Sequence, residues 1–195
     1  MCTLSDKPAA EAPDSVLGPL VRVIDEASGD EPWALIGSTA LRLQGIPSHS
    51  PNLEFITSAA VVEALASMLG LETDRNRSQN IAATRLQFLR HGVPVFVFAE
   101  PIFHGRYDSL KPLEIPSLWD ARVRSDYDGV RVPCTPLEWE LLLSVILQAR
   151  QRAELLRQHL RTRGFDSRLI VRLLREGHVD RETEEAVWSV LEHED

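Results

Sequence analysis

The sequence predicts an α+β fold: a small mixed sheet flanked by helices and followed by a C-terminal helical segment. Short apolar runs, bounded by glycine and polar residues, recur between residues 33 and 133, as is typical of strands that alternate with helices. From Thr135 onward, apolar residues recur at helical spacing instead. We therefore expect a disordered tail over 1–13, an α/β core over 14–133, and a helical region over 134–195 that packs on the core.

The composition excludes several classes of protein. The chain has 195 residues, of which 44% are hydrophobic, which is enough for one full core. Its net charge of −8 is unlike that of a general nucleic-acid binder, whose affinity comes from a basic surface. The printed sequence contains no cationic start followed by an apolar core and no apolar run of membrane-spanning length. We expect a cytoplasmic protein that binds neither membranes nor nucleic acid.

The first elements are a helix and a buried strand. Asp14 or Ser15 can cap a helix whose apolar stripe ends before Gly29. Trp33 to Ile36 then form a continuous apolar run, which is expected of a strand covered on both faces.

A turn follows this strand at Gly37 and Ser38. Glycine lets the backbone turn sharply and serine is a good N-cap, so we expect a short helix over Thr39 to Gln44 that Gly45 ends. The N-terminus of a helix offers free N–H groups that suit a phosphate. An ordinary strand-to-helix turn with a serine cap has the same sequence, so both interpretations stay open.

A second strand begins near Leu53, and two polar side chains accompany it. Asn52 and Glu54 lie two residues apart, so both point to the same face of the strand. Two polar oxygens beside a helix N-terminus suit a metal ion, for which Glu54 is the candidate ligand. The alternatives are a loop-closing hydrogen bond for Asn52 and a solvated acid for Glu54.

The rest of the core alternates between helix, strands and loops. Thr57 or Ser58 caps a helix that runs to Leu69 and ends at Gly70. His91 and Gly92 make a short hairpin turn. The remaining expected elements are a polar connection (71–78), two strands (83–90 and 93–99), a loop-rich segment (101–128) and a final hairpin (119–124 with 130–133).

Three helical segments end the chain. Thr135 is expected to cap the first, with Glu138 at the third helical position as in a capping box. This helix either runs to residue 160 or breaks near Ala149. Asp166 and Asp180 are expected to cap the two helices that follow.

The chain resembles the nucleotidyltransferase superfamily over residues 30 to 190, and in particular its minimal and abortive-infection-type members, with the specific motifs confined to the first part. The resemblance rests on an apolar strand, Gly37-Ser38, a helix, and a polar pair on the next strand after thirteen intervening residues, 39 to 51. A later segment is also similar: Ala121-Arg122-Val123, Gly129, Val132-Pro133 and Pro136-Leu137-Glu138. The resemblance implies that Gly37 and Ser38 bind the triphosphate of a nucleotide.

The sequence departs from this family at its charged positions. The family pair is Asp-x-Asp or Asp-x-Glu, whereas here Asn52 takes the first place and only Glu54 keeps a charge. The third carboxylate of the family would fall on Phe96. Glu100 lies four residues further, about 13 Å at strand rise, which is too far to substitute without a bulge. Ser144 stands for a family lysine, and Arg152, Ala153 and Glu154 occupy the place of a later charged cluster.

Three functional hypotheses follow. The leading one is a catalytically degenerate nucleotidyltransferase-fold protein that binds a nucleotide weakly or a protein partner, in the toxin–antitoxin or defence setting that the resemblance implies. The alternative is an active enzyme that uses Mg²⁺ and a nucleoside triphosphate to move a nucleoside monophosphate onto protein or RNA, with Glu54 as metal ligand and Asn52 as auxiliary ligand. The third is an interaction module whose C-terminal helices bind a partner or a second copy. The arginine-rich segment 150–163 could contact phosphates, but a solvated helix face is the simpler interpretation.

Overall fold

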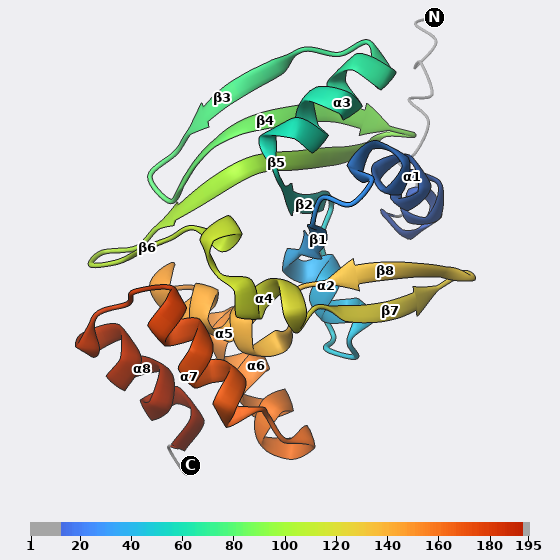
Figure 1. The fold of residues 1–195 in the computed structure, drawn as a ribbon. Coiled ribbons are helices and arrows are strands. Elements are labelled where there is room, and N and C mark those ends of the chain that lie inside the picture. The colour runs from blue at the N-terminus through green and yellow to red at the C-terminus, as the bar shows by residue number, and fades with distance from the viewer. Residues whose placement is uncertain (1–12, 193–195) are drawn as a thin grey trace, which may run out of the picture.

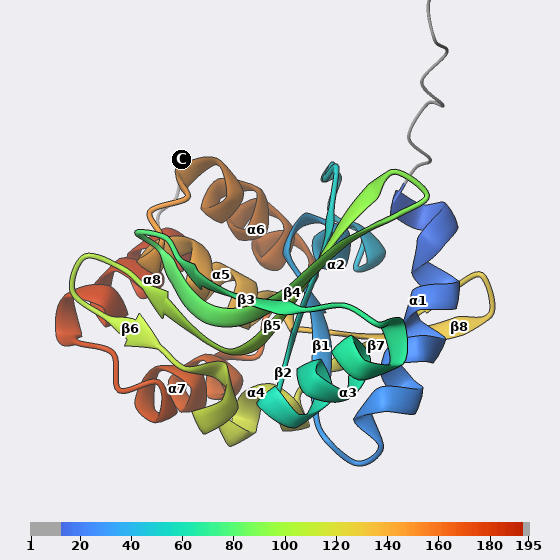
Figure 2. The same ribbon diagram turned by 90° about the horizontal axis from the view of Figure 1, so that it is seen from above.

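The computed structural model describes residues 13–192, which form one mixed sheet with helices on both faces (Figures 1 and 2). The sheet has eight strands in the order β3-β4-β5-β2-β1-β8-β7, and β6 pairs with β5 outside this path. β2 and β5 are parallel, as are β1 and β8, while the other pairs are antiparallel. The predicted tail over 1–13 lies outside the described residues except for Pro13, which begins the first helix.

The elements have the following bounds. The strands are β1 (Trp33–Ile36), β2 (Leu53–Thr57), β3 (Thr73–Arg77), β4 (Ile81–Arg90), β5 (Val93–His104), β6 (Ser109–Leu110), β7 (Val123–Tyr127) and β8 (Val130–Cys134). The helices are α1 (Pro13–Ser28), α2 (Gly37–Leu43), α3 (Ala59–Leu69), a 3₁₀ turn (Pro112–Glu114), α4 (Pro116–Asp120), α5 (Leu137–Ile146), α6 (Arg150–Arg163), α7 (Ser167–Glu176) and α8 (Arg181–Glu192).

Two hydrophobic clusters lie on opposite faces of the sheet. Along β1, Trp33 and Leu35 pack into the cluster that α1 and α3 cover, whereas Ala34 and Ile36 pack into the cluster under α4 to α8. All four side chains are buried, which explains the continuous apolar run of this strand. Figure 1 shows α1 and α3 beside the upper strands and α4 to α8 gathered below them. The α+β fold predicted from the sequence is confirmed.

Most buried elements lie where the sequence predicts them. β1 and β2 have the expected bounds, and His91-Gly92 is the turn between β4 and β5. Ser58 caps α3 by accepting a hydrogen bond from the Val61 amide, and Gly70 ends the helix in a left-handed conformation. Asp166 caps α7, and Asp180 accepts a hydrogen bond from the Thr183 amide at the start of α8.

Several predicted loops are wrong. The expected connection 71–78 contains β3, and β5 continues to His104 rather than ending at Ala99. The loop-rich segment after it contains β6, a 3₁₀ turn and α4, so that Trp119 is helical and the hairpin is β7 with β8. β3 has almost no buried side chain, so its sequence carries no apolar alternation that would predict a strand.

The capping box expected at Thr135 is also wrong. Pro136 stands at the N-cap of α5 and no side chain caps that end. Glu138 instead accepts a hydrogen bond from the amide of Asp166. The helix breaks at residues 147–149, the nearer of the two predicted end points. No helix within residues 13–192 is long and apolar enough to cross a membrane.

Candidate functional site

The predicted site lies where β1, α2 and β2 meet the first turns of α5 and α6. Gly37 directly follows β1 with a φ of 78°, a left-handed conformation that favours glycine. A Cβ atom at this position would lie 2.9 Å from Oε2 of Glu54. Two features therefore favour glycine at position 37: the left-handed backbone conformation and the close approach of the Glu54 carboxylate.

Asn52 and Glu54 lie together, as their spacing predicts. The Asn52 side-chain amide donates to Oε1 of Glu54 at 3.0 Å, and the Ser50 hydroxyl donates to Oδ1 of Asn52. Both polar atoms of Asn52 are thus engaged within the protein. This arrangement agrees with the loop-closing role that was the alternative for Asn52.

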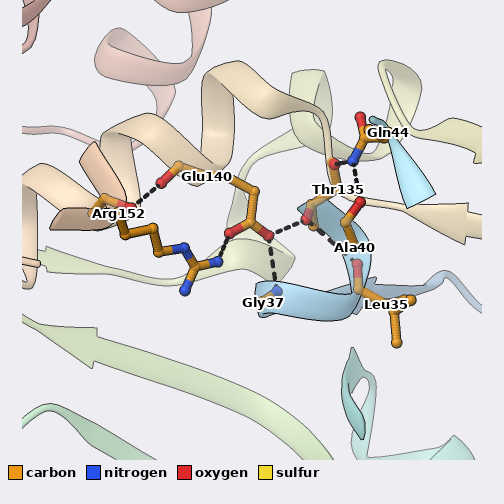
Figure 3. A network of polar contacts seen from close by, with 8 residues as sticks. Leu35, Gly37, Ala40, Gln44, Thr135, Glu140 and Arg152 are labelled. Carbon is orange, nitrogen blue, oxygen red and sulfur yellow. Dashed lines mark hydrogen bonds and ion pairs between the residues drawn. The ribbon is translucent and has the colours of Figure 1, made fainter. Parts of the chain in front are cut away.

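A second carboxylate, Glu140 of α5, completes the site and was not predicted from the sequence. Its side chain is fully buried. The Gly37 amide donates to Oε1 of Glu140 at 3.2 Å, and the Thr135 hydroxyl donates to the same oxygen (Figure 3). Arg152 of α6 forms an ion pair with Oε2 (Figure 3). Three donors from three segments therefore compensate the buried charge of Glu140.

Burial dominates the electrostatics of Glu54. Loss of solvent raises the pKa of the Glu54 carboxyl above its ordinary value, and the nearby charge of Glu140 raises it further. The hydrogen bond from Asn52 and the positive charge of Arg152 oppose the rise. Glu54 is thus a partly buried acid in contact with this network rather than a solvated acid on a strand face.

Phe96 faces Glu54 across two parallel strands. The register pairs Glu54 of β2 with Phe96 of β5, which is where the resemblance places the third carboxylate. The ring of Phe96 stacks on Phe98 with 6.3 Å between centroids, and the guanidinium of Arg85 lies 5.6 Å from its centroid. An aromatic cluster therefore stands beside Glu54.

The structure does not bring Glu100 into the site. Glu100 is exposed, has a φ of 46°, and lies within a register irregularity between β4 and β5. It lines a separate surface depression together with Arg75 and Arg77 of β3. A bulge in β5 was the one feature that could have brought Glu100 closer to Glu54, but the irregularity found here leaves Glu100 at this separate depression.

The residues present do not fit a two-metal centre with a nucleoside triphosphate. Such a centre needs several anionic oxygens, whereas Asn52 is neutral and already hydrogen-bonded, and Phe96 is apolar. Glu140 is close, but its two oxygens bind Gly37, Thr135 and Arg152. Within residues 13–192, no group of three or more His, Cys, Asp or Glu side chains is arranged to hold a metal ion.

Ser38 does not cap the helix that follows it. α2 begins at Gly37, and its N-cap residue, Ile36, makes no capping hydrogen bond with its side chain. The backbone is already helical at Ser38, so its hydroxyl lies past the capping position. The Gly37 amide, which was expected to be free for a phosphate, is engaged by Glu140.

Two further features of the helices bear on the sequence predictions. Ser144, at the place of the family lysine, donates its hydroxyl to the carbonyl of Glu140 at 2.6 Å. Arg157 lies nearly buried and binds Glu154, and together with Gln158 it holds the pKa of Glu154 at about 2. Arg152 and Arg157 thus both bind carboxylates of the protein itself rather than forming a free basic face.

One signal in the sequence could have revealed Glu140. It occupies a helix whose other positions are almost all apolar, Leu137 to Ile146, and a charge there must be buried and compensated. Its partners Thr135 and Arg152 lie 5 and 12 positions away, whereas Gly37 lies 103 positions away. Spacing within α5 therefore predicts that a partner exists but not which residue it is.

Comparison with known proteins supports the same fold. A proposed nucleotidyltransferase from Thermotoga maritima superposes with a TM-score of 0.57 at 16% identity, over 80% of this chain and 99% of that protein. The antibiotic-resistance factor ANT(2'')-Ia (TM-score 0.46, 13% identity, 89% and 90% covered) is also similar. So is an antigenic nucleotidyltransferase-like protein from Paracoccidioides brasiliensis (0.47, 12%, 93% and 96%).

The chain thus has a nucleotidyltransferase-type fold, and the first of these comparisons is the one that carries the assignment. No protein-family model matches the sequence, and no curated protein matches it. At such low identity the likeness establishes fold alone, since one fold hosts many functions.

Proposed function

We propose that this protein is a catalytically degenerate nucleotidyltransferase-fold protein that acts by binding rather than by transfer of a nucleotide. One observation carries the proposal: the Gly37 amide donates its hydrogen bond to the carboxylate of Glu140, whereas the family resemblance would give this amide a phosphate. Phe96 supports it, because an aromatic ring stands opposite Glu54 in place of a metal-binding acid.

The Glu140–Arg152 ion pair supplies the two charges that a bound phosphate and a metal ion would bring to the Gly37 turn. Glu140 supplies the anion at the Gly37 turn, and Arg152 supplies the positive charge that a metal ion would otherwise bring. A triphosphate entering this turn would meet the charge of Glu140 and would have to displace it from a buried site. We therefore expect nucleotides to bind weakly and without help from Mg²⁺.

The Gly37 turn disfavours nucleotides, and its internal ion pair does not interfere with binding of a protein partner elsewhere on the molecule. We propose that the partner, or a second copy of the chain, docks on the C-terminal helical region in the cytoplasm. The toxin–antitoxin or defence setting implied by the family resemblance belongs to the same proposal. Light scattering of the purified chain distinguishes self-association from a monomer that awaits another protein.

Calorimetric titration with ATP and with GTP tests the nucleotide part of the proposal. We expect dissociation constants of about 1 mM or weaker, unchanged by Mg²⁺, and the same in the E54A variant. The E140Q variant, which removes the competing charge but keeps its hydrogen-bonding shape, should bind the nucleotides no more weakly than the parent. Micromolar binding that requires Mg²⁺ and is lost in E54A would instead support the active enzyme.

A further inference from the structure

A pocket of about 430 Å³ lies away from Glu54, between the turn that follows β5 and the helices α5, α6 and α8. Gly105 on its wall lies nine residues beyond Phe96, roughly 30 Å along an extended chain. Neither Gly37 nor Glu54 lines it. Figures 1 and 2 both place β6 and α8 on the same side of the molecule. The pocket has the volume of a small-molecule site.

The walls of this pocket are fixed by specific contacts. Gly105 approaches α5 so closely that an added Cβ would lie 2.6 Å from the side chain and carbonyl of Ile146. Asp108 in the same turn accepts hydrogen bonds from the Asp180 amide, at 2.8 Å, and from the Thr183 hydroxyl. The turn is thereby tied to both α5 and the start of α8, so that the pocket is formed before any ligand arrives.

The floor of the pocket is apolar and its rim carries two arginines. Val145, Ile146, Ala153, Ala186 and Val190 are its aliphatic lining residues. The guanidinium of Arg106 lies 5.0 Å from the centre of the Tyr107 ring, which leaves its N–H groups free to donate. Among the described residues, neither Arg106 nor Arg150 forms an ion pair with a carboxylate.

The two acidic residues at this pocket differ in whether their carboxylates already accept hydrogen bonds. Asp108 is engaged by the start of α8, so its oxygens are already hydrogen-bonded. Glu182 also lines the pocket and is exposed, and its charge opposes that of the arginines. Two guanidinium groups and two carboxylates therefore line the pocket, next to an exposed tyrosine ring, and of the two carboxylates only that of Glu182 has no hydrogen-bond donor among the described residues.

We propose that this pocket binds a small organic anion with a flat aromatic body, held by Arg106 and Arg150 through its carboxylate or phosphate group. Guanidinium groups match the geometry of both anions, and the ring of Tyr107 and the aliphatic floor receive the aromatic part. The proposal is independent of the proposed function, because it uses none of the residues at Gly37 and Glu54.

Calorimetric titration of the full chain with phenyl phosphate, benzoate and benzyl alcohol tests the proposal. We expect saturable binding of at least one anion, with a dissociation constant of about 1 mM or tighter, and none of the neutral alcohol. Phenyl phosphate and benzoate separate the two kinds of anion.

Variants locate the binding in the pocket. R106Q/R150Q should weaken the binding at least about tenfold, and A186W should abolish it by filling the floor. E182Q should strengthen it two- to threefold, since it removes a like charge. R163Q, on the exposed end of α6, is the matched control and should have no effect. Thermal melting confirms that each variant folds.

Two outcomes would overturn the proposal. One is the absence of saturable binding for both anions up to about 10 mM, and the other is binding that R106Q/R150Q and A186W leave unchanged. Binding lost in E54A or R152M but kept in the pocket variants would place the anion at the Gly37 site instead. Because nucleotides are not the probes here, failure of this proposal leaves the proposed function untouched.

Discussion

At the scale of single residues, Gly37 occupies a position that no other amino acid can take without strain. Its φ of 78° is left-handed, and the Glu54 carboxylate lies where a Cβ would project. Gly70 has a similar φ of 63° but open space around its missing Cβ. The two glycines therefore form a matched pair that separates backbone strain from steric contact.

We predict that Gly37→Ala lowers the free energy of unfolding by more than Gly70→Ala does. The Gly70 variant should cost about 1 to 2 kcal/mol from the left-handed conformation alone. The Gly37 variant should cost at least about 1 kcal/mol more, because Glu54 must move away from its hydrogen bond with Asn52. Urea denaturation measures both, and equal losses would contradict the close contact.

The acid Glu54 makes stability depend on pH in a direction that can be measured. Burial raises its pKa in the folded state, so the folded protein holds this proton at a higher pH than the unfolded chain does. Its contribution to stability is therefore fully present below the unfolded pKa and is lost as pH rises through the folded pKa.

We predict that Glu54→Gln gains stability relative to the parent protein as the pH rises from 4 to 7. Glutamine keeps an acceptor for the Asn52 amide but has no charge to desolvate. Urea denaturation of both proteins at several pH values gives the difference directly. A difference that falls with increasing pH would show that Arg152, rather than burial, controls this acid.

Part of the site could be predicted from residues that are near in sequence. The shared face of Asn52 and Glu54 follows from their spacing, and the strand register pairs Glu54 with Phe96. Glu140 could not be placed in the same way, because its contact with Gly37 joins residues 103 positions apart. Tertiary packing, and not local pattern, decides which buried charges meet.

At the scale of elements, the Glu140–Arg152 pair ties α5 to α6 across the break between them. The carboxylate is fully buried and the Arg152 side chain is 27% exposed. Removing one partner of such a pair leaves an uncompensated charge in the interior. The pair therefore holds the beginning of α6 against α5 and the Gly37 turn.

We predict that Arg152→Met lowers the free energy of unfolding by about 3 kcal/mol, the low end for a buried pair because the arginine is partly exposed. The double variant E140Q/R152M should lose less than R152M alone, since no charge then remains buried. Arg150→Met on the same turn is the control and should change stability by less than about 0.5 kcal/mol. A loss in R152M no larger than in this control would contradict the account.

The central strands with a buried face were predictable, whereas the exposed strand β3 was not, and neither were the end of β5 and the short helix α4. The apolar residues of β1 and β2, and the hairpin of β4 with β5, follow from their pattern. The sequence of β3, TDRNR, has no apolar residue. This edge strand is held by backbone pairing to β4, with an ion pair between Asp74 and Arg85, and not by burial of side chains. Pairing of this kind leaves no periodic signal in the sequence.

At the scale of the whole molecule, the fold is of the nucleotidyltransferase type, whereas the residues of the site do not fit the two-metal chemistry of such enzymes. The architecture is that of nucleotidyltransferases, as the comparison with the Thermotoga maritima protein indicates. The residues at the Gly37 turn form an internal network, in which Glu140 accepts the Gly37 amide and pairs with Arg152, while Nε of Arg152 has no partner among the described residues. The fold was predictable because buried strands and glycine turns determine it, whereas the internal network depends on long-range contacts.

Transfer of a radiolabelled nucleoside monophosphate tests the central proposal most directly. The purified protein is incubated with each of the four labelled nucleoside triphosphates, Mg²⁺ or Mn²⁺, and protein or RNA acceptors, beside the E54A variant and a metal-free control. We predict no labelling of any acceptor above the metal-free control, and no difference between the parent protein and E54A. Metal-dependent labelling that disappears in E54A would contradict a degenerate site and establish an active nucleotidyltransferase.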